Sequence, residues 1–280
     1  MSDARLSNLG QITSPIDRGI QNLLLDDGEN ARRALLTQLL GSGAGAANSL
    51  VFREEITEIT DDMYDSIDDG SFDLVHAGMH YTAPSGRDYF MADANYFLGH
   101  GDTELAKNHM LMIEGDISIT AQHQTTNVTT GGATSSLIYT NTLPAHQAEL
   151  EADFGAEHII EVRLLMCNAV TNGVPSGWAW AGKKSFIPNM PMVFGHYLQY
   201  SGNTGEMFNG GNRVRQVALF QKMPELIVAR LHTTQARQWW WCDDVASAAY
   251  FAYVSDNGHA NANSASLVLG VRRAFLIGKS

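Results

Sequence analysis

Hydrophobic positions in the first fifty residues follow the spacing of helices. The Ser14-Pro15 pair suits a helix start, because serine caps the first turn and proline fits within it. Apolar residues then recur at helical spacing, namely Ile16, Ile20, Leu23 and Leu24. A second leucine-rich helix is predicted over residues 31–40, followed by a flexible linker over residues 41–47 (G-S-G-A-G-A-A). The two helices are expected either to fold back on the rest of the chain or to dock onto another protein.

The stretch 54–68 combines an apolar helical face with an acidic one. The apolar positions are Ile56, Ile59, Met63 and Ile67. The acidic positions are Glu54, Glu55, Glu58, Asp61, Asp62, Asp65 and Asp68. These acids lack the alternating spacing of an EF-hand loop, so the pattern indicates a solvated helix face rather than a calcium loop.

After Gly70 the chain breaks into short segments separated by glycine, asparagine and proline. Residues 145–154 and 157–170 have the composition of helices, whereas 186–198 and the chain from Trp239 onward are rich enough in aromatic and β-branched residues for strands. The expected fold is α+β: a helical segment with its linker (1–50), then a domain of short, mixed antiparallel strands with long loops (51–280).

Charge and composition exclude two classes of partner. The net charge is −12, with 18 basic residues against 30 acidic ones, which disfavours nucleic-acid binding. The chain has no run of about 18 apolar residues, so membrane insertion is not expected. Because no signal peptide is recognisable, we expect synthesis in the cytoplasm; Cys167 and Cys242 fit a reducing compartment, although a bridge between them stays open.

Motifs that carry chemistry are not found in this sequence. It has no nucleophile elbow, zinc-protease motif, phosphate-binding loop or dinucleotide fingerprint. His76 and His80 are separated by Gly78, which argues against a helical zinc pair, and His109 is expected to be a structural histidine at a strand start. Cys242 precedes two acids that would raise its pKa, so it is interpreted as structural. No catalytic residue, metal or cofactor is predicted.

The C-terminal stretch is the most informative part of the chain. Residues 239–245 (W-W-W-C-D-D-V) predict a tryptophan-bearing strand, and 249–254 (A-Y-F-A-Y-V) alternate as a half-buried strand does. A polar stretch, 255–264, predicts a displayed hairpin loop. A last strand is expected within 270–277 (G-V-R-R-A-F-L-I).

The C-terminal segments 239–245, 249–254 and 270–277 together resemble the C-type-lectin-fold domain found in phages and prophages. That domain often ends in W-W-L-R-x-V, A-x-F-x-x-V and G-V-R-P-A-F. Phage major tropism determinants and formylglycine-generating enzymes use the same fold. Earlier segments also match the phage versions, and the resemblance covers about residues 52–278. These segments lie at 62–64, 70–72, 101–103, 108–109, 126–132, 218–220 and 224–227.

The sequence departs from these families at several positions. Cys242 stands where the phage motif has arginine, and Arg273 where it has proline; neither change is expected to break the fold. The calcium-dependent sugar site of animal C-type lectins is matched only by 187–189 (I-P-N) and 241–243 (W-C-D), each lacking one oxygen ligand, so calcium binding is not expected. The copper-binding cysteines of formylglycine-generating enzymes are not matched by Cys167 and Cys242.

The resemblance implies a non-enzymatic phage virion protein at the particle surface, in a tail fibre, tail tip or head fibre. By analogy with tropism determinants, host attachment through a bacterial surface glycan or protein would use the polar loop, with Asp256, Asn257, His259, Asn261, Asn263 and Ser264 as ligand-binding candidates. The same loop could equally be an ordinary solvated hairpin. Structural roles are expected for Trp239, Trp240, Phe251, Gly270 and Arg272.

Assembly and the alternative functions follow from the same resemblance. Residues 1–50 are expected to anchor the chain to other virion proteins, and a homo-oligomer, with a trimer as the expected form, would suit a fibre. One alternative is a purely architectural collar or decoration protein without a ligand. Another is an enzyme of the formylglycine-generating type or a glycan hydrolase, but nothing in the sequence places two carboxylates together.

Overall fold

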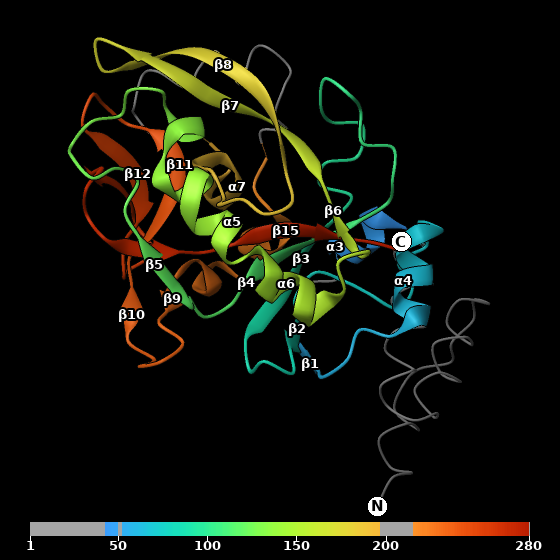
Figure 1. Ribbon diagram of the computed structural model, residues 1–280. Helices are drawn as coiled ribbons and strands as arrows, with labels where there is room; N and C mark the ends of the chain where they lie inside the picture. Colours follow the sequence, from blue (N-terminus) through green and yellow to red (C-terminus); the bar gives the residue numbers. More distant parts are fainter. Residues whose placement is uncertain (1–42, 50–51, 197–214, 280) are drawn as a thin grey trace, which may run out of the picture.

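The computed structural model describes residues 43–49, 52–196 and 215–279, and the predicted helices in the first 40 residues lie outside them. The described chain is a mixed α+β structure, as expected, with more strand than helix (Figure 1). The helical segments are α3 (Ala44–Ser49), α4 (Asp61–Asp68), η1 (Ala133–Ser135), η2 (Ile138–Thr142), α5 (Leu143–Ala145), α6 (Gln147–Phe154), α7 (Met190–Phe194), α9 (Ala218–Lys222) and η3 (Pro224–Ile227). No helix among the described residues is long and apolar enough to cross a membrane.

One sheet has six strands in the order β1-β2-β3-β4-β15-β6. Their bounds are β1 (Glu54–Ile56), β2 (Met79–Thr82), β3 (Asp88–Ala94), β4 (Met110–Glu114), β15 (Ala274–Ile277) and β6 (Ile159–Ile160). The C-terminal strand β15 therefore lies inside the sheet, antiparallel to both β4 and β6. Figure 1 shows it running across the middle of the molecule.

The second sheet has five strands in the order β13-β12-β11-β14-β5. Their bounds are β13 (Ala260–Ser264), β12 (Tyr250–Val254), β11 (Trp240–Val245), β14 (Leu269–Val271) and β5 (Ile119–Ala121). This confirms the predicted tryptophan-bearing strand and the alternating strand. The polar stretch expected to be a hairpin loop forms the strand β13 in its second half, and the single last strand expected within 270–277 is divided into β14 and β15, which belong to different sheets. Only Arg272 and Arg273 separate β14 from β15, so these two arginines lie where the chain passes from one sheet to the other.

Two antiparallel ribbons complete the strands: β7 (Val162–Thr171) with β8 (Val174–Lys183), and β9 (Ala229–Arg230) with β10 (Arg237–Gln238). In Figure 1 the β7–β8 ribbon arches along the top and the β9–β10 ribbon hangs at the lower left. The prediction of a helix over 157–170 is wrong, since this stretch forms β6 and β7. Asn172 and Gly173, both at positive φ, make the tight turn to β8, and an Asn-Gly pair between apolar runs was the signal for a hairpin.

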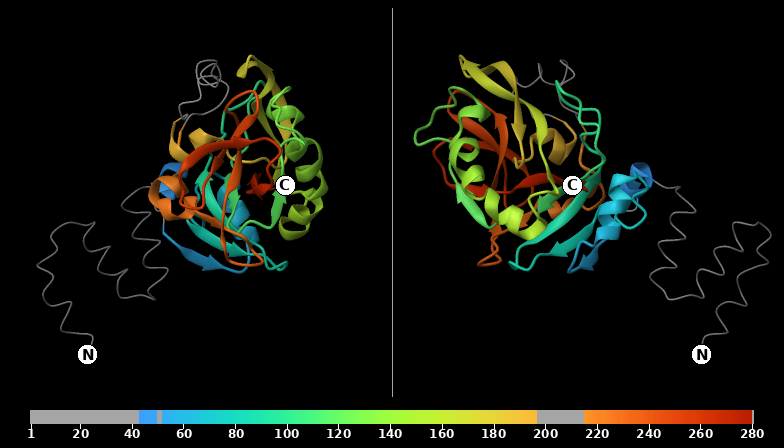
Figure 2. Two further views of the ribbon diagram at one scale, coloured as in Figure 1. Left: turned by 90° about the vertical axis from the view of Figure 1, so that its left-hand side faces the viewer. Right: turned by 45° about the vertical axis from the view of Figure 1, so that its right-hand side comes forward.

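Both faces of the six-stranded sheet are buried, which accounts for the uninterrupted burial of β4. Along β3, Phe90 and Ala92 belong to a core cluster shared with the five-stranded sheet, whereas Tyr89 and Met91 face a second cluster. That second cluster includes Tyr64 and Ile67 of α4 together with Leu150 and Phe154 of α6. Figure 2 (right) shows α3 and α4, blue to cyan, at this edge of the molecule.

Three further predictions need correction. Residues 44–47, expected to belong to a flexible linker, begin α3, because alanine favours helix and the small side chains let α3 pack against β3. Within 54–68 only Asp61–Asp68 is helical, and Glu54–Ile56 pairs in parallel with β2. Within 186–198, Met190–Phe194 is a helix rather than a strand, because Asn189 caps it and Pro191 fits its first turn. The helix expected over 145–154 is confirmed as α6 with the end of α5.

Candidate functional site

A polar cleft of about 640 Å³ lies between the β2–β3 side of the six-stranded sheet and the β9–β10 ribbon. Its volume falls in the range of about 300–1,000 Å³ that is typical of small-ligand sites. The lining is dominated by charged and polar side chains. They are Arg53, His80, Thr82, Asp88, Asp116, Glu225, Arg230, His232, Gln235, Arg237 and Arg272.

Backbone hydrogen bonds hold the two walls of the cleft together. Ile117 N donates to Arg230 O (2.7 Å), and His232 N donates to Ile117 O (3.0 Å), so the ribbon is attached directly beside Asp116. Gly115 N donates to Asp88 O (2.8 Å), which places Asp88 against the same turn. A Cβ at residue 115 would collide with the Asp88 carboxylate, so glycine is required for this close approach.

Asp88 is the centre of a hydrogen-bond network on the floor of the cleft. It accepts from His80 Nε2 (3.0 Å) and from Asp116 N (3.1 Å). Burial alone would raise the pKa of Asp88, but these hydrogen bonds and nearby positive charge lower it overall. Burial likewise opposes protonation of His80, yet its hydrogen bonds to Asp88 and Glu55 raise its pKa. Both shifts favour the charged forms, the carboxylate of Asp88 and the imidazolium of His80.

Gln235 connects the ribbon to the cleft floor. Its Nε2 donates to Asp116 Oδ2 (2.6 Å), and its backbone has a φ of 58°, the left-handed region that favours glycine. A non-glycine residue held there carries strain of order 1–3 kcal/mol, a feature that clusters at ligand sites. The Asp116 hydrogen bond accounts for a glutamine at this position.

The cleft also contains a group of three potential metal ligands, Asp88, Asp116 and His232, whose ligand atoms lie within 4.8 Å of one another. The chemistry of the surroundings does not favour a cation. Both carboxylates already accept hydrogen bonds, from His80 and Gln235 respectively, and the cleft wall brings four arginines against three carboxylates. These groups fit the recognition of a polar or anionic ligand better than the binding of a metal ion.

The predicted ligand-binding residues lie on one hairpin, β12–β13, which the structure places beside the cleft. Asn257, His259 and Asn261 are exposed. A Cβ at Gly258, in the turn, would lie 3.3 Å from Val228 Cγ2, and Val228 lines the cleft. The turn residues Asp256, Asn257 and His259 are thus near the cleft.

The other predicted ligand-binding residues follow the edge strand β13 away from this turn. Asn263 and Ser264 are half-buried, and the register places Ser264 opposite Tyr250, at the far end of the hairpin from Ala260 and Val254. The side chains of Asn261 and Asn263 accept hydrogen bonds from the backbone of the next residue, both at 2.8 Å. They therefore help to shape the strand on which they lie.

Most of the residues expected to have structural roles lie in the interior of the described structure. Trp240 is completely buried and its Nε1 donates to Ile227 O (3.0 Å), and Phe251 stacks on His123 at a ring distance of 3.8 Å. A Cβ at Gly270 would lie 2.7 Å from Ile117 Cδ1. Trp239 differs, because it is 36% exposed and stacks on Tyr253.

The histidines and cysteines singled out in the sequence have the following surroundings in the structure. His76 and His80 make separate contacts, with Glu54 and with Glu55 and Asp88, rather than a shared metal pair. His109 precedes β4, is buried, and accepts a hydrogen bond from Phe97 N. Cys167 and Cys242 are buried and not bridged. Burial, reinforced by Asp244 and Asp243, raises the pKa of the Cys242 thiol well above its ordinary value, as expected for a structural cysteine.

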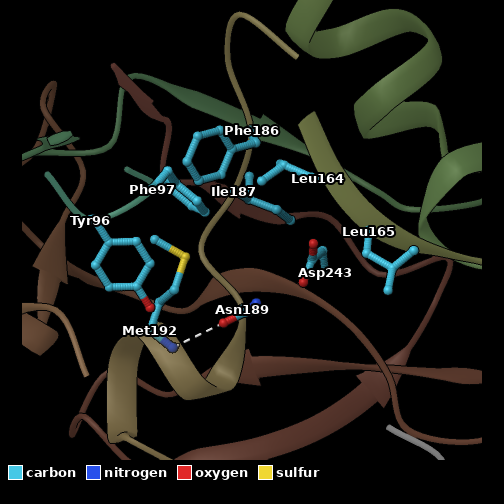
Figure 3. A pocket seen from close by; sticks show the side chains of 9 residues that line it. All are labelled: Tyr96, Phe97, Leu164, Leu165, Phe186, Ile187, Asn189, Met192 and Asp243. Carbon is cyan, nitrogen blue, oxygen red and sulfur yellow. Dashed lines mark hydrogen bonds between the residues drawn. The ribbon is translucent and has the colours of Figure 1, made fainter. Parts of the chain in front are cut away.

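The two partial matches to the lectin calcium site meet in one small, mostly apolar pocket. Asn189 and Asp243 both line it, together with aromatic and aliphatic side chains, among them Tyr96, Phe97 and Leu164 (Figure 3). The side-chain oxygen of Asn189 accepts a hydrogen bond from Met192 N (2.9 Å) and thereby caps α7. The I-P-N segment thus serves as a helix start.

Asp244, beside this pocket, predicts a pH effect on stability. Burial raises its pKa from 3.8 to about 7, although its carboxylate accepts from Met190 N (2.6 Å). The pKa of Asp244 is higher in the folded state than in the unfolded state. Its contribution to the free energy of unfolding is therefore fully present below about pH 4 and is lost as the pH rises toward about 7. Asp244→Asn stays neutral, so its stability relative to the wild type should rise by roughly 2–4 kcal/mol between pH 4 and pH 8.

Urea unfolding of both proteins at pH 4 and pH 8 measures this effect. The difference between the two proteins cancels the titration of groups that do not interact with Asp244, such as His123, whose pKa burial lowers to about 3. The prediction is contradicted if the two proteins differ in their free energy of unfolding by the same amount at pH 4 and at pH 8.

Sequence reasoning missed the cleft, including Asp88, Asp116, Arg230, Gln235 and Arg237. Among the known proteins with which the chain was compared, no family model, curated protein or solved structure matches it.

Proposed function

We propose that the chain is a bacteriophage virion protein that displays its folded domain on the particle surface and attaches the particle to a bacterial surface. The observation that carries the proposal is the juxtaposition of an exposed polar hairpin turn and a preformed polar cleft. Rigid strands on both sides hold their side chains in place before any ligand arrives, which reduces the entropic cost of binding. The resemblance of residues 239–277 to phage lectin-fold domains supports the same assignment.

The hydrogen bonds to Asp88 do not suit this carboxylate to the acid step of a glycan hydrolase, which supports binding as the role of the cleft. A glycan hydrolase needs one carboxylic acid whose pKa is raised so that it can protonate the leaving group. Here Asp88 has the opposite shift, since His80 and Asp116 N hydrogen bond to its ionised form. A fixed carboxylate of this kind is suited to accepting hydrogen bonds from a ligand's hydroxyl groups. The proposed role is accordingly non-enzymatic.

The proposal includes an oligomer, with a trimer as the expected form, that is anchored to other virion proteins through residues 1–50. Several copies of one modest binding site would then act together, and multivalency would raise the overall affinity. The alternative is an architectural collar or decoration protein, for which the hairpin would be an ordinary solvated loop.

Binding of the labelled full-length protein to a panel of bacterial species tests the proposal, with light scattering to measure the oligomeric state. We expect a trimer that labels at least one species. The triple variant Asn257→Ala, His259→Ala, Asn261→Ala should lower the apparent affinity about tenfold, equivalent to ~1.4 kcal/mol.

A matched control is the double variant Thr171→Ala, Ser176→Ala, which removes an exposed hydrogen-bonded pair from the β7–β8 hairpin. It should bind as the wild type does. If the wild-type protein labels no species, attachment is refuted and the architectural role becomes the better account. If the triple variant and the control lose the same amount of affinity for cells, the binding role of the β12–β13 hairpin is refuted.

A further inference from the structure

We propose that the cleft binds an acidic oligosaccharide, with the anionic group between Arg230 and Arg237 and the hydroxyl groups on Asp116 and Gln235. This inference rests on the proposed attachment function and names the class of ligand.

The two arginines lie side by side on the wall of the cleft. Arg230 and Arg237 are direct partners across the antiparallel β9–β10 pair, so their side chains emerge on the same face, and both line the cleft. Like charges directly opposite each other destabilise a strand pair. Arg230 Nη1 donates to Gln235 O (2.8 Å), which orients one guanidinium. An anion between the two would convert their repulsion into a pair of charge-assisted hydrogen bonds.

These two arginines differ from the other described arginines in the groups with which they are paired. Over residues 43–49, 52–196 and 215–279, five arginines form ion pairs with carboxylates, and Arg272 donates to two backbone carbonyls. The five are Arg53, Arg87, Arg163, Arg215 and Arg273. Within the same residues, Arg230 and Arg237 have no carboxylate partner. In a chain with 30 acidic residues and 18 basic ones, two exposed arginines in one cleft that have no carboxylate partner among the described residues indicate a site for an external anion.

The other side chains of the cleft indicate which groups the rest of the ligand carries. Asp88, Asp116 and Glu225 also line the cleft, and these carboxylates would repel a densely charged polyanion. They accept hydrogen bonds, so a ligand that carries many hydroxyl donors and few negative charges matches both sets of groups. Gln235 and His232 add polar groups beside Asp116. A sugar chain with a carboxylate or a phosphate has this combination, whereas a nucleic acid would need a longer series of cations.

Calorimetric titration of the full-length protein with three probes tests the inference. The probes are trigalacturonic acid, a phosphorylated maltotriose and neutral maltotriose, which separate a carboxylate, a phosphate and an uncharged ligand. We expect at least one acidic probe to bind about tenfold or more tightly than maltotriose, with an affinity that falls as salt is added. The preferred acidic probe shows which anionic group the cleft selects.

The variant Arg230→Gln, Arg237→Gln should lower that affinity about tenfold or more, while Arg163→Gln, which removes an exposed arginine paired with Asp102, should leave it unchanged. The melting temperature of the double variant should not fall, because the substitution relieves a repulsion. The inference is overturned if no probe binds, if neutral and acidic probes bind equally, or if Arg163→Gln has the same effect. Labelling of cells without acidic-sugar binding refutes this inference alone; sugar binding without labelling refutes only the attachment function.

Discussion

Replacing Arg273 by methionine is expected to lower the free energy of unfolding by roughly 3–5 kcal/mol, because the change would leave the buried carboxylate of Glu114 without its counter-charge. Both side chains are fully inaccessible to solvent. Arg273 Nη2 lies 3.0 Å from Glu114 Oε1, and Arg273 Nε lies 3.1 Å from Glu114 Oε2, so the pair is bidentate. Ser118 Oγ donates to the same carboxylate and accepts from Arg273.

The pair also ties the two sheets together. Glu114 ends β4 in the six-stranded sheet, and Arg273 stands between β14 of the five-stranded sheet and β15 of the six-stranded one. Arg273 N donates to Glu114 Oε2 (3.2 Å), so the backbone takes part as well. A proline at position 273, as in the phage motif that this segment resembles, would have neither this donor nor the guanidinium. The contacts of Glu114 with the backbone and side chain of residue 273 therefore depend on arginine at this position.

Urea unfolding measures this prediction with a double variant as an internal test. Arg273→Met combined with Glu114→Met exchanges both charges for apolar side chains, and it should be more stable than Arg273→Met alone despite the additional change. Arg163→Met removes an exposed ion pair and should cost at most about 1 kcal/mol. A loss below about 1 kcal/mol for Arg273→Met, or a double variant that is less stable than the single one, would show that the pair does not stabilise the fold in this way.

Local patterns in the sequence predicted the elements that depend on local chemistry. The alternation in 249–254 specified β12, and the polar stretch after it specified the hairpin to β13. Helix composition failed for 157–170, because the pairing with β8 across the Asn172-Gly173 turn outweighs weak helix propensity. Alanine and glycine at 44–47 were interpreted as linker, although the same small side chains allow α3 to lie against β3.

The cleft could not be predicted because its residues are far apart in the chain. Asp88 begins β3, Asp116 follows β4, and Arg230 and Arg237 belong to a ribbon more than 100 positions later. No periodicity or motif links such positions; the backbone pairing of Ile117 with residues 230 and 232 and the hydrogen bond from Gln235 to Asp116 bring them together. The same holds for Arg273, which was recognised as a departure from the phage motif, whereas its partner Glu114 lies 159 positions away.

Arg272 is the second residue whose replacement should have a large effect, and for a different reason from Arg273. Its Nε donates to Glu114 O (2.8 Å) and its Nη1 to Leu226 O (2.7 Å), and the guanidinium carbon lies 5.3 Å and 5.2 Å from the ring centres of Phe220 and Trp240. Burial lowers its pKa to about 10, against the opposing influence of Glu114, so the group stays charged at neutral pH. Two carbonyls and two aromatic faces thus stabilise a charge that also forms part of the cleft wall.

Arg272→Met is therefore expected to lower the free energy of unfolding by roughly 2–5 kcal/mol, since each buried acceptor left without a donor costs about 1–3 kcal/mol. Arg272→Lys should cost nearly as much, because a single ammonium group cannot donate to both carbonyls while also contacting both rings. Urea unfolding of both variants checks this, with Arg237→Met, an exposed arginine of the same cleft, expected within about 0.5 kcal/mol of the wild type. If Arg272→Lys retained wild-type stability, the positive charge alone would be sufficient for stability. The pair of hydrogen bonds from Arg272 to Glu114 O and Leu226 O would then not explain its contribution.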